Sequence, residues 1–268
     1  MCRMSFKKET PLANAAFWAA RKGNLALLQL LLNSGRVDVD CRDSSGATAL
    51  FFAAQQGHDD IVNFLFQSGA STEFTTKDGG TALLAASQNG HARVVETLLK
   101  NGANIRDQLC DGATPLFLAA QSGYVDVIRL LLSCGARVNQ QRQDGTTPLW
   151  IASQMDHKEV VRVLLLRGAD RDATRTDGST ALFKAAHKGY SEVIEELLKF
   201  SPKLGILKNG TSPLHAAVLS GDTRAVALLL EAGADPTLRN KAHELPAQLT
   251  KNERILKLLQ RKATGTKG

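Results

Sequence analysis

The stretch Asp111–Gly123, which reads DGATPLFLAAQSG, decides the fold. Thr114 offers a side-chain oxygen that can cap a helix, and Pro115 has the fixed φ angle that suits a first helical turn. The small pair Ala119-Ala120 allows another helix to approach closely. Gly123 can take the left-handed conformation that ends a helix. The stretch therefore predicts a short helix over about residues 115–122.

The same pattern recurs along the chain, four times at a spacing of 33 residues and finally at 32. The equivalents of Thr114-Pro115-Leu116 are Thr48-Ala49-Leu50, Thr81-Ala82-Leu83, Thr147-Pro148-Leu149, Thr180-Ala181-Leu182 and Ser212-Pro213-Leu214. In each copy a second segment follows with apolar residues at helical spacing, and it usually ends at Gly-Ala. A polar, turn-prone stretch of about ten residues then suits a β-hairpin-like loop before the next copy.

A unit of this length, with two helices, a hairpin loop, a TPLH-like start and a Gly-Ala end, resembles the ankyrin repeat. The resemblance covers about residues 11–262 and implies an all-α solenoid of about seven stacked units with a degenerate C-terminal cap. We expect an N-terminal tail at 1–10 and a C-terminal tail at 263–268. The expected units between them are 11–42, 43–75, 76–108, 109–141, 142–174, 175–206, 207–239 and 240–262.

Four departures from the family pattern predict local differences. Asp156 occupies a position that normally holds glycine, so we expect a left-handed residue there. Segment 201–208 lacks both the Gly-Ala ending and one residue, which predicts a local irregularity or bend. The last copy ends in a polar, basic helix over 253–262 that suits a solubilising cap. The His of TPLH remains only at His215 and is replaced elsewhere by Phe51, Leu84, Phe117, Trp150 and Phe183.

Charge and composition exclude several classes of protein. The net charge of +7 lies at the two ends, because residues 11–249 carry 24 basic and 24 acidic side chains. A nucleic-acid surface would need a basic stripe on the folded body, so we expect no nucleic-acid binding. No apolar stretch approaches the roughly 18 residues of a membrane span, and the first residues lack a secretory signal. We expect a cytoplasmic or nuclear monomer.

Catalytic and metal-binding patterns are also missing. The chain has no phosphate-binding loop, nucleophile elbow or metalloprotease motif, and its four cysteines have no zinc spacing. His58, His91 and His157 share one repeat position, so adjacent copies should stand roughly 10 Å apart, too far to share a metal. We expect no enzyme activity, no metal site and no cofactor.

The resemblance implies that a protein partner binds the concave face formed by first helices and hairpin tips. One candidate set is a row of glutamines: Gln55, Gln88, Gln121 and Gln154. Their amides could bind an extended peptide, although glutamine is also simply a soluble helix residue. The second set lies at the tips: Lys77, Leu109, Arg142, Arg175, Lys208 and Lys241. Basic tips would suit an acidic segment, or they could be solvated charges.

Three further hypotheses concern single features. Trp150, near Met155, is either an exposed hot spot or, more usually in such a setting, a core residue. Ankyrin hairpins that are hydroxylated carry Leu eight residues before a Val-Asn, and Leu131 and Val138-Asn139 resemble this pattern. The resemblance implies hydroxylation of Asn139. The matching residues in other repeats are Asp40, Arg106, Asp172 and Thr237. The alternative function is a peripheral membrane module in which basic residues contact anionic lipid. Those residues are Lys251, Arg254, Lys257, Arg261, Lys262 and Lys267.

Overall fold

The computed structural model describes residues 10–265 and places them in two compact units that divide between residues 136 and 137. Residues 1–9, with most of the expected N-terminal tail, and residues 266–268, with Lys267, lie outside the described part. Within each unit the chain forms consecutive helix pairs, and no helix of the described residues is long and apolar enough to cross a membrane.

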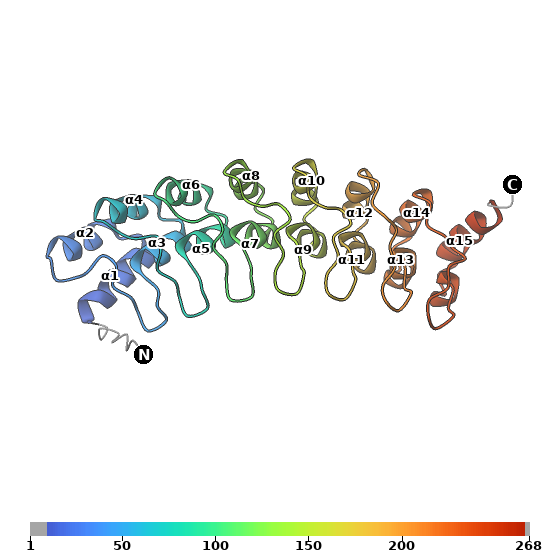
Figure 1. The fold of residues 1–268 in the computed structure, drawn as a ribbon, viewed down its shortest axis with the longest axis horizontal. Coiled ribbons are helices and arrows are strands. Elements are labelled where there is room, and N and C mark those ends of the chain that lie inside the picture. The colour runs from blue at the N-terminus through green and yellow to red at the C-terminus, as the bar shows by residue number, and fades with distance from the viewer. Residues whose placement is uncertain (1–9, 266–268) are drawn as a thin grey trace. The chain divides into compact units, whose positions relative to one another are not determined.

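The first unit contains four helix pairs (Figure 1). Their first helices are α1 (Pro11–Lys22), α3 (Ala49–Gln56), α5 (Ala82–Gln88) and α7 (Pro115–Ser122). Their second helices are α2 (Leu25–Asn33), α4 (Asp59–Gln67), α6 (Ala92–Lys100) and α8 (Val125–Ser133). We call these the first-row and second-row helices, because each set forms its own row in the unit.

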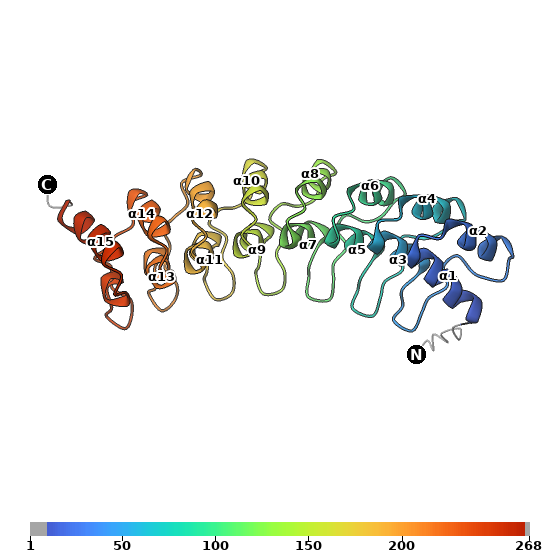
Figure 2. The ribbon, with the colours of Figure 1, turned by 180° about the vertical axis from the view of Figure 1, so that it is seen from behind.

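The second unit contains three further pairs and a final half-regular one. Its first-row helices are α9 (Pro148–Gln154), α11 (Ala181–Lys188) and α13 (Pro213–Ser220), and its second-row helices are α10 (Lys158–Leu166), α12 (Ser191–Leu198) and α14 (Thr223–Glu231). The 3-10 helix η1 (Pro246–Leu249) and α15 (Glu253–Gly265) complete it. Figure 2 shows the two rows of this unit from the opposite side.

Local sequence sets both ends of the first-row helices. The hydroxyl oxygen of Thr114 accepts a hydrogen bond from the Phe117 N–H at 3.1 Å, and Pro115 occupies the first turn of α7. Gly123 then ends α7 with a φ of 85°, in the left-handed region. In α13 the cap includes His215, whose ring nitrogen Nδ1 lies 2.7 Å from Ser212 Oγ. The helix expected from the Thr-Pro-Leu stretch is therefore confirmed.

The core lies between the two rows and between successive pairs. Ala53, Ala86 and Ala119 have no exposed surface, so consecutive first-row helices can approach closely. In the second row, Ile61, Val95 and Ile128 are equally buried. The helices α1, α3, α5 and α7 pack in succession, as do α9, α11 and α13. Each pair thus buries its apolar surface against its neighbours, which confirms an all-helical, solenoid-like repeat fold.

The loops between pairs form turns and no β-strands among the described residues. The expected hairpin character is limited to the tips, where a chain reversal is closed by backbone hydrogen bonds such as Arg142 N–H to Thr146 O at 2.9 Å. In Figure 1 these loops project beyond the first-row helices of each unit. The tips and the exposed side of the first row therefore form one surface within a unit.

The irregular positions follow the departures seen in the sequence. Asp156 has a φ of 61°, so it does adopt the left-handed conformation. The segment after α12 is irregular as well: no helix covers residues 201–208, and Ser201 has a φ of 49°. The final pair begins with η1 in place of an α-helix, and α15 continues to Gly265, past the expected end at residue 262.

Candidate partner-binding surface

Each loop tip is closed by an oxygen that accepts backbone N–H groups, but the residue that supplies this oxygen changes along the chain. In one tip, Asp43 Oδ1 accepts hydrogen bonds from the N–H groups of Ser45 and Ala47, both at 2.9 Å. In the last tip, Asn240 Oδ1 accepts from Glu244 N–H at 3.0 Å. These side chains hold the turn in the way expected of Asx residues.

Arg142 and Arg175 occupy the position of Asp43 in their own repeats and cannot accept such a bond. The acceptor comes from two residues later instead. Asp144 Oδ1 accepts from Thr146 N–H at 3.1 Å, and Asp177 Oδ1 accepts from Ser179 N–H at 2.9 Å. The same replacement closes the loops that begin at Leu109 and Leu207. The turn is preserved, and the side chains of Arg142 and Arg175 are free to make other contacts.

The two arginines use that freedom to join neighbouring tips. Arg142 Nη2 lies 3.5 Å and Arg175 Nη2 3.3 Å from the same oxygen, Oδ2 of Asp144. Arg175 also approaches Asp177, at 4.0 Å. Burial alone would raise the pKa of the Asp144 carboxyl, but the hydrogen bonds from Thr146 and the charges of the two arginines outweigh it and lower the pKa. These guanidinium groups, expected as partner contacts, are thus already shared with tip carboxylates.

Trp150 lies beneath this network. Only 3% of its surface is exposed, and its indole N–H donates to Ser179 Oγ at 3.2 Å. The Arg175 guanidinium lies 4.8 Å from the ring centroid and the Lys184 ammonium 5.6 Å from it. Trp150 is therefore a core residue and not an exposed hot spot, whereas Met155 is 45% exposed.

The remaining tip residues have exposed or half-exposed side chains. Lys77, Lys208 and Lys241 are exposed, and Leu109 is half-buried. Their backbone connects successive tips within a unit: Lys77 N–H donates to Ser45 O at 2.9 Å, and Lys241 N–H donates to Asn209 O at 3.0 Å. The lysine side chains thus project from a backbone that adjacent loops hold in place.

The glutamine row is less exposed than its sequence positions suggest. Gln88 is exposed, whereas Gln55, Gln121 and Gln154 are half-buried. The backbone carbonyl of Gln55 is 3.0 Å from His91 Nε2, so this part of the row also joins one repeat to the next. Gln55, Gln88 and Gln121 belong to the first unit and Gln154 to the second.

His58, His91 and His215 contact backbone oxygens of neighbouring repeats. His58 Nε2 lies 3.1 Å from the carbonyl oxygen of Arg21 in the preceding repeat, as His91 does from Gln55. His215 is fully buried, and its Nε2 lies 3.1 Å from Glu244 O. No group of three His, Cys, Asp or Glu side chains in the described residues has the arrangement of a metal site.

Burial, followed by the charge of Asp38, raises the pKa of the Cys41 thiol to about 11.

Asn139 takes part in another link between repeats. It is exposed, and its Oδ1 accepts a hydrogen bond from Asp170 N–H at 2.8 Å. Asp40 makes the same contact with Ser71 N–H at 3.0 Å, and Asp172 makes it with Lys203 N–H at 2.8 Å. The side-chain oxygen at this position therefore holds the following turn in three repeats.

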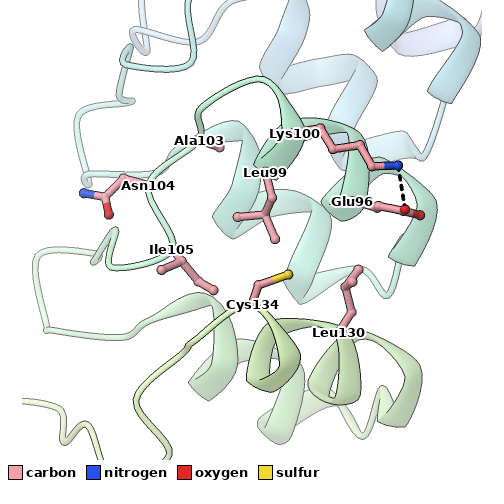
Figure 3. Close-up of a pocket in the computed structure, with 8 residues that line it drawn as sticks. All are labelled: Glu96, Leu99, Lys100, Ala103, Asn104, Ile105, Leu130 and Cys134. Atoms are coloured by element: carbon pink, nitrogen blue, oxygen red, sulfur yellow. Dashed lines mark ion pairs between the residues drawn. The ribbon is translucent and has the colours of Figure 1, made fainter.

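A pocket of about 530 Å³ in the first unit has no counterpart in the sequence reasoning (Figure 3). Its walls come from the ends of α6 and α8 and from the loop after α6. Leu99, Ile105 and Leu130 surround the exposed thiol of Cys134, and the Glu96–Lys100 ion pair, 2.7 Å long, lies at one side. The pocket is lined by second-row helices and is thus separate from the tip surface.

The C-terminal helix α15 presents its cations to solvent. Lys251, just before it, and Arg254, Lys257, Arg261 and Lys262 within it are exposed. Its apolar residues Ile255 and Leu259 are buried, and the helix packs on α14. The helix has therefore already used its apolar face within the fold.

Comparison with known proteins identifies the family. The family model described as "Ankyrin repeats (3 copies)" matches residues 5–78, 83–175 and 149–240. These matches cover most of the sequence, and the chain belongs to the ankyrin repeat family. Members of this family are typically non-enzymatic modules for protein–protein interaction.

Full-length relatives and a solved structure agree with this assignment. The chain is 77% identical over 295 residues to Ankyrin repeat domain-containing protein 29 of Homo sapiens, with 98% of each chain covered. It is 72% identical over 290 residues to the Danio rerio protein of that name, with 96% of this chain and 97% of the relative covered. The crystal structure of the human ASB11 ankyrin repeat domain matches 81% of this chain and 98% of its own, with a TM-score of 0.74 and 26% identity.

The alignment lengths show that the human relative has positions with no counterpart in this chain. The human alignment spans 295 positions, whereas 98% of this 268-residue chain is about 263 residues. About 32 positions of that relative therefore have no counterpart here, which is the length of one repeat. A repeat array can differ in this way because each unit contacts only its neighbours.

Proposed function

We propose that this chain is a scaffold or adaptor that binds a segment of a partner protein on the surface formed by the first-row helices and the loop tips. It acts through occupancy of that surface, without catalysis or cofactor. We further infer that it works as a monomer in the cytoplasm or nucleus. An extended or acidic segment is the partner that the glutamines and the basic tips favour.

The observation that carries the proposal is the contrast between buried and exposed positions of the first-row helices. In the first-row helices from α3 to α13, the residue five positions after the capping Thr or Ser is always alanine and fully buried, at Ala53, Ala86, Ala119, Ala152, Ala185 and Ala217. Eight residues after the cap the side chain changes in nearly every repeat and is mostly exposed: Gln56, Asn89, Ser122, Met155, Lys188 and Ser220. Packing fixes the first position, whereas the second is free to fit a partner.

Proximity labelling in cells tests this proposal. The intact chain would be compared with a variant that combines Lys77→Glu, Lys208→Glu and Lys241→Glu, all at exposed tip positions. A matched control reverses the same number of charges on second-row helices or at their ends, through Lys100→Glu, Lys158→Glu and Lys199→Glu. Circular dichroism would confirm equal folding of all three proteins.

Partners that are lost in the tip variant and kept in the control would support the tip surface. An identical partner list for the tip variant and the intact chain would contradict it. Sedimentation equilibrium provides a separate test of the monomer.

The alternative is peripheral membrane binding through the cations of α15, and their exposure is the observation that favours it. Because Ile255 and Leu259 are buried, such binding would be electrostatic, at about 1 kcal/mol for each cation near an anionic surface. Sedimentation with vesicles that contain phosphatidylserine, lost on deletion of residues 251–268, would support it. Equal sedimentation of the truncated chain would contradict it.

A further inference from the structure

Three cations and a histidine cluster on α11 and the tip that precedes it, all within the second unit. Lys184, His187 and Lys188 lie on the exposed side of α11, and Arg175 lies in the tip loop. Lys184 and Arg175 both approach the Trp150 ring, at 5.6 and 4.8 Å from its centroid. The His187 ring stacks on Phe183 at 6.5 Å with an angle of 18° between the rings.

The positive charges of Lys184 and Lys188 are not neutralised by an ion pair among the described residues. Arg175, in contrast, shares Asp144 and Asp177. The pKa of Lys184 is lowered by burial, then by Lys188 and Arg175, and the opposing effect of Asp177 is smaller. The pKa of His187 is lowered by burial, then by Lys184 and Lys188. Lys184, Lys188 and Arg175 therefore repel one another in the free protein, and the lysine charges disfavour the protonated form of His187.

Helix electrostatics do not account for the cluster. The C-terminal end of a helix does attract cations. However, the neighbouring first-row helices α9 and α13 have no basic residue in their last turn. Within the second unit the cluster is thus particular to α11 and is not a general requirement of the packing there.

Exposed apolar side chains flank the cluster on both sides. Met155 on the α9 side is 45% exposed, and Leu219 on α13 is 57% exposed. Met155 shares the repeat position of Lys188, and Leu219 shares that of His187. Because α11 packs directly against α9 and α13, and packed helices lie roughly 10 Å apart, Met155 and Leu219 are separated by roughly 20 Å. About six residues of extended chain span that distance.

From this arrangement we infer that the exposed face of α9, α11 and α13 binds an extended acidic peptide of a partner protein. Two central carboxylates face Lys184, His187 and Lys188, and apolar side chains on either side contact Met155 and Leu219. This inference rests on the proposed function and specifies the chemistry of the partner. Figure 1 shows the three helices side by side in the first row of the second unit.

Two immobilised hexapeptide libraries would test the inference on the full chain. In both libraries the first and last residues are apolar; the two central residues are Asp or Glu in one and Asn or Gln in the other. We expect at least tenfold stronger binding to the acidic library. The preference should disappear in the double variant Lys184→Glu, Lys188→Glu, and also weaken at high salt.

The matched control is Lys257→Glu, Arg261→Glu, which reverses two cations at the same spacing on exposed α15. This control variant should keep the preference for the acidic library. Because Lys184 is half-buried, Lys188→Glu alone provides a second variant if the double variant does not fold. In the intact chain, addition of a captured acidic peptide should raise the pKa of His187, which NMR measures directly.

Equal binding to both libraries, or a preference that survives reversal at Lys184 and Lys188, would overturn the inference. Capture of the neutral library alone would also overturn it, while the proposed function would still stand. If neither library binds although the tip variant loses partners in cells, the acidic segment is excluded and the tip surface is retained.

Discussion

Replacement of Asp156 tests the repeat geometry most directly. Asp156 follows the end of α9 with a φ of 61°, where other repeats have glycine, such as Gly57 with a φ of 81°. The left-handed conformation costs a non-glycine residue about 1–2 kcal/mol, and somewhat less for Asp. A glycine at this position in turn lowers the stability of the fold by about 0.4–1 kcal/mol, because it gives the unfolded chain more conformational freedom.

A second contribution comes from the carboxylate of Asp156. Its pKa is raised by partial burial and by the nearby charge of Glu192, so the ionised form is disfavoured in the folded chain. We therefore expect Asp156→Gly to stabilise the fold by about 0.5–1 kcal/mol at pH 7. For a chain of this size that corresponds to a rise in Tm of about 1–4 °C, measured by circular dichroism.

Two further variants separate geometry from charge. Asp156→Asn keeps a residue that tolerates the left-handed region and removes the charge, whereas Asp156→Ala removes the charge but loses that tolerance. We expect Tm to fall in the order Gly, Asn, Asp, Ala. Because the pKa of Asp156 is higher in the folded state, its ionisation destabilises the fold as pH rises above the unfolded pKa of about 3.9. Below that pH, the Asp156→Asn variant should therefore be no more stable than the intact chain. A lower Tm for Asp156→Gly would refute the reasoning.

Three other predictions concern packing and modification. Gly57→Ala should lower the free energy of unfolding in urea by about 2–3 kcal/mol, because the added Cβ would lie 2.5 Å from His91 Nδ1 and the φ angle is 81°. Gly69 has open space around it and a φ of 87°, so Gly69→Ala should cost only the backbone strain of about 1–2 kcal/mol. Equal costs would mean that the ring contact is unimportant. Leu131→Ala, at a fully buried position, should cost about 2–5 kcal/mol by the same assay, and a cost below 1 kcal/mol would contradict its place in the core. Incubation with an asparaginyl hydroxylase should add one oxygen atom to Asn139, detected by mass spectrometry, and an unmodified peptide would dispose of that hypothesis.

The difference in length from the human relative has a physical explanation. Each helix pair packs only on its neighbours, and its ends are capped by residues of its own repeat, as Thr114 caps α7. Removal of one whole unit therefore leaves the remaining interfaces of the same kind. The difference of about 32 positions from the human relative is compatible with an intact fold for this reason.

Sequence reasoning located the cores and ends of the helices well. Threonine caps, the proline of a first turn and left-handed glycines act over three or four residues, so the spacing of Thr114, Pro115 and Gly123 already contains the information. The departure at Asp156 was predictable on the same basis. The projecting loops were also predictable, and among the described residues their tips are closed by single turns without β-strands.

The sequence by itself determined the repeat length, the helix pairs and the family, because all of these follow from local patterns repeated at a constant interval. Only the tertiary structure decided which surface groups are available. It shows Arg142 and Arg175 sharing Asp144, Trp150 buried against Ser179, and Lys184 and Lys188 without an ion pair among the described residues. These contacts join residues about one repeat apart, and their outcome depends on how neighbouring side chains compete for the same charges and the same space.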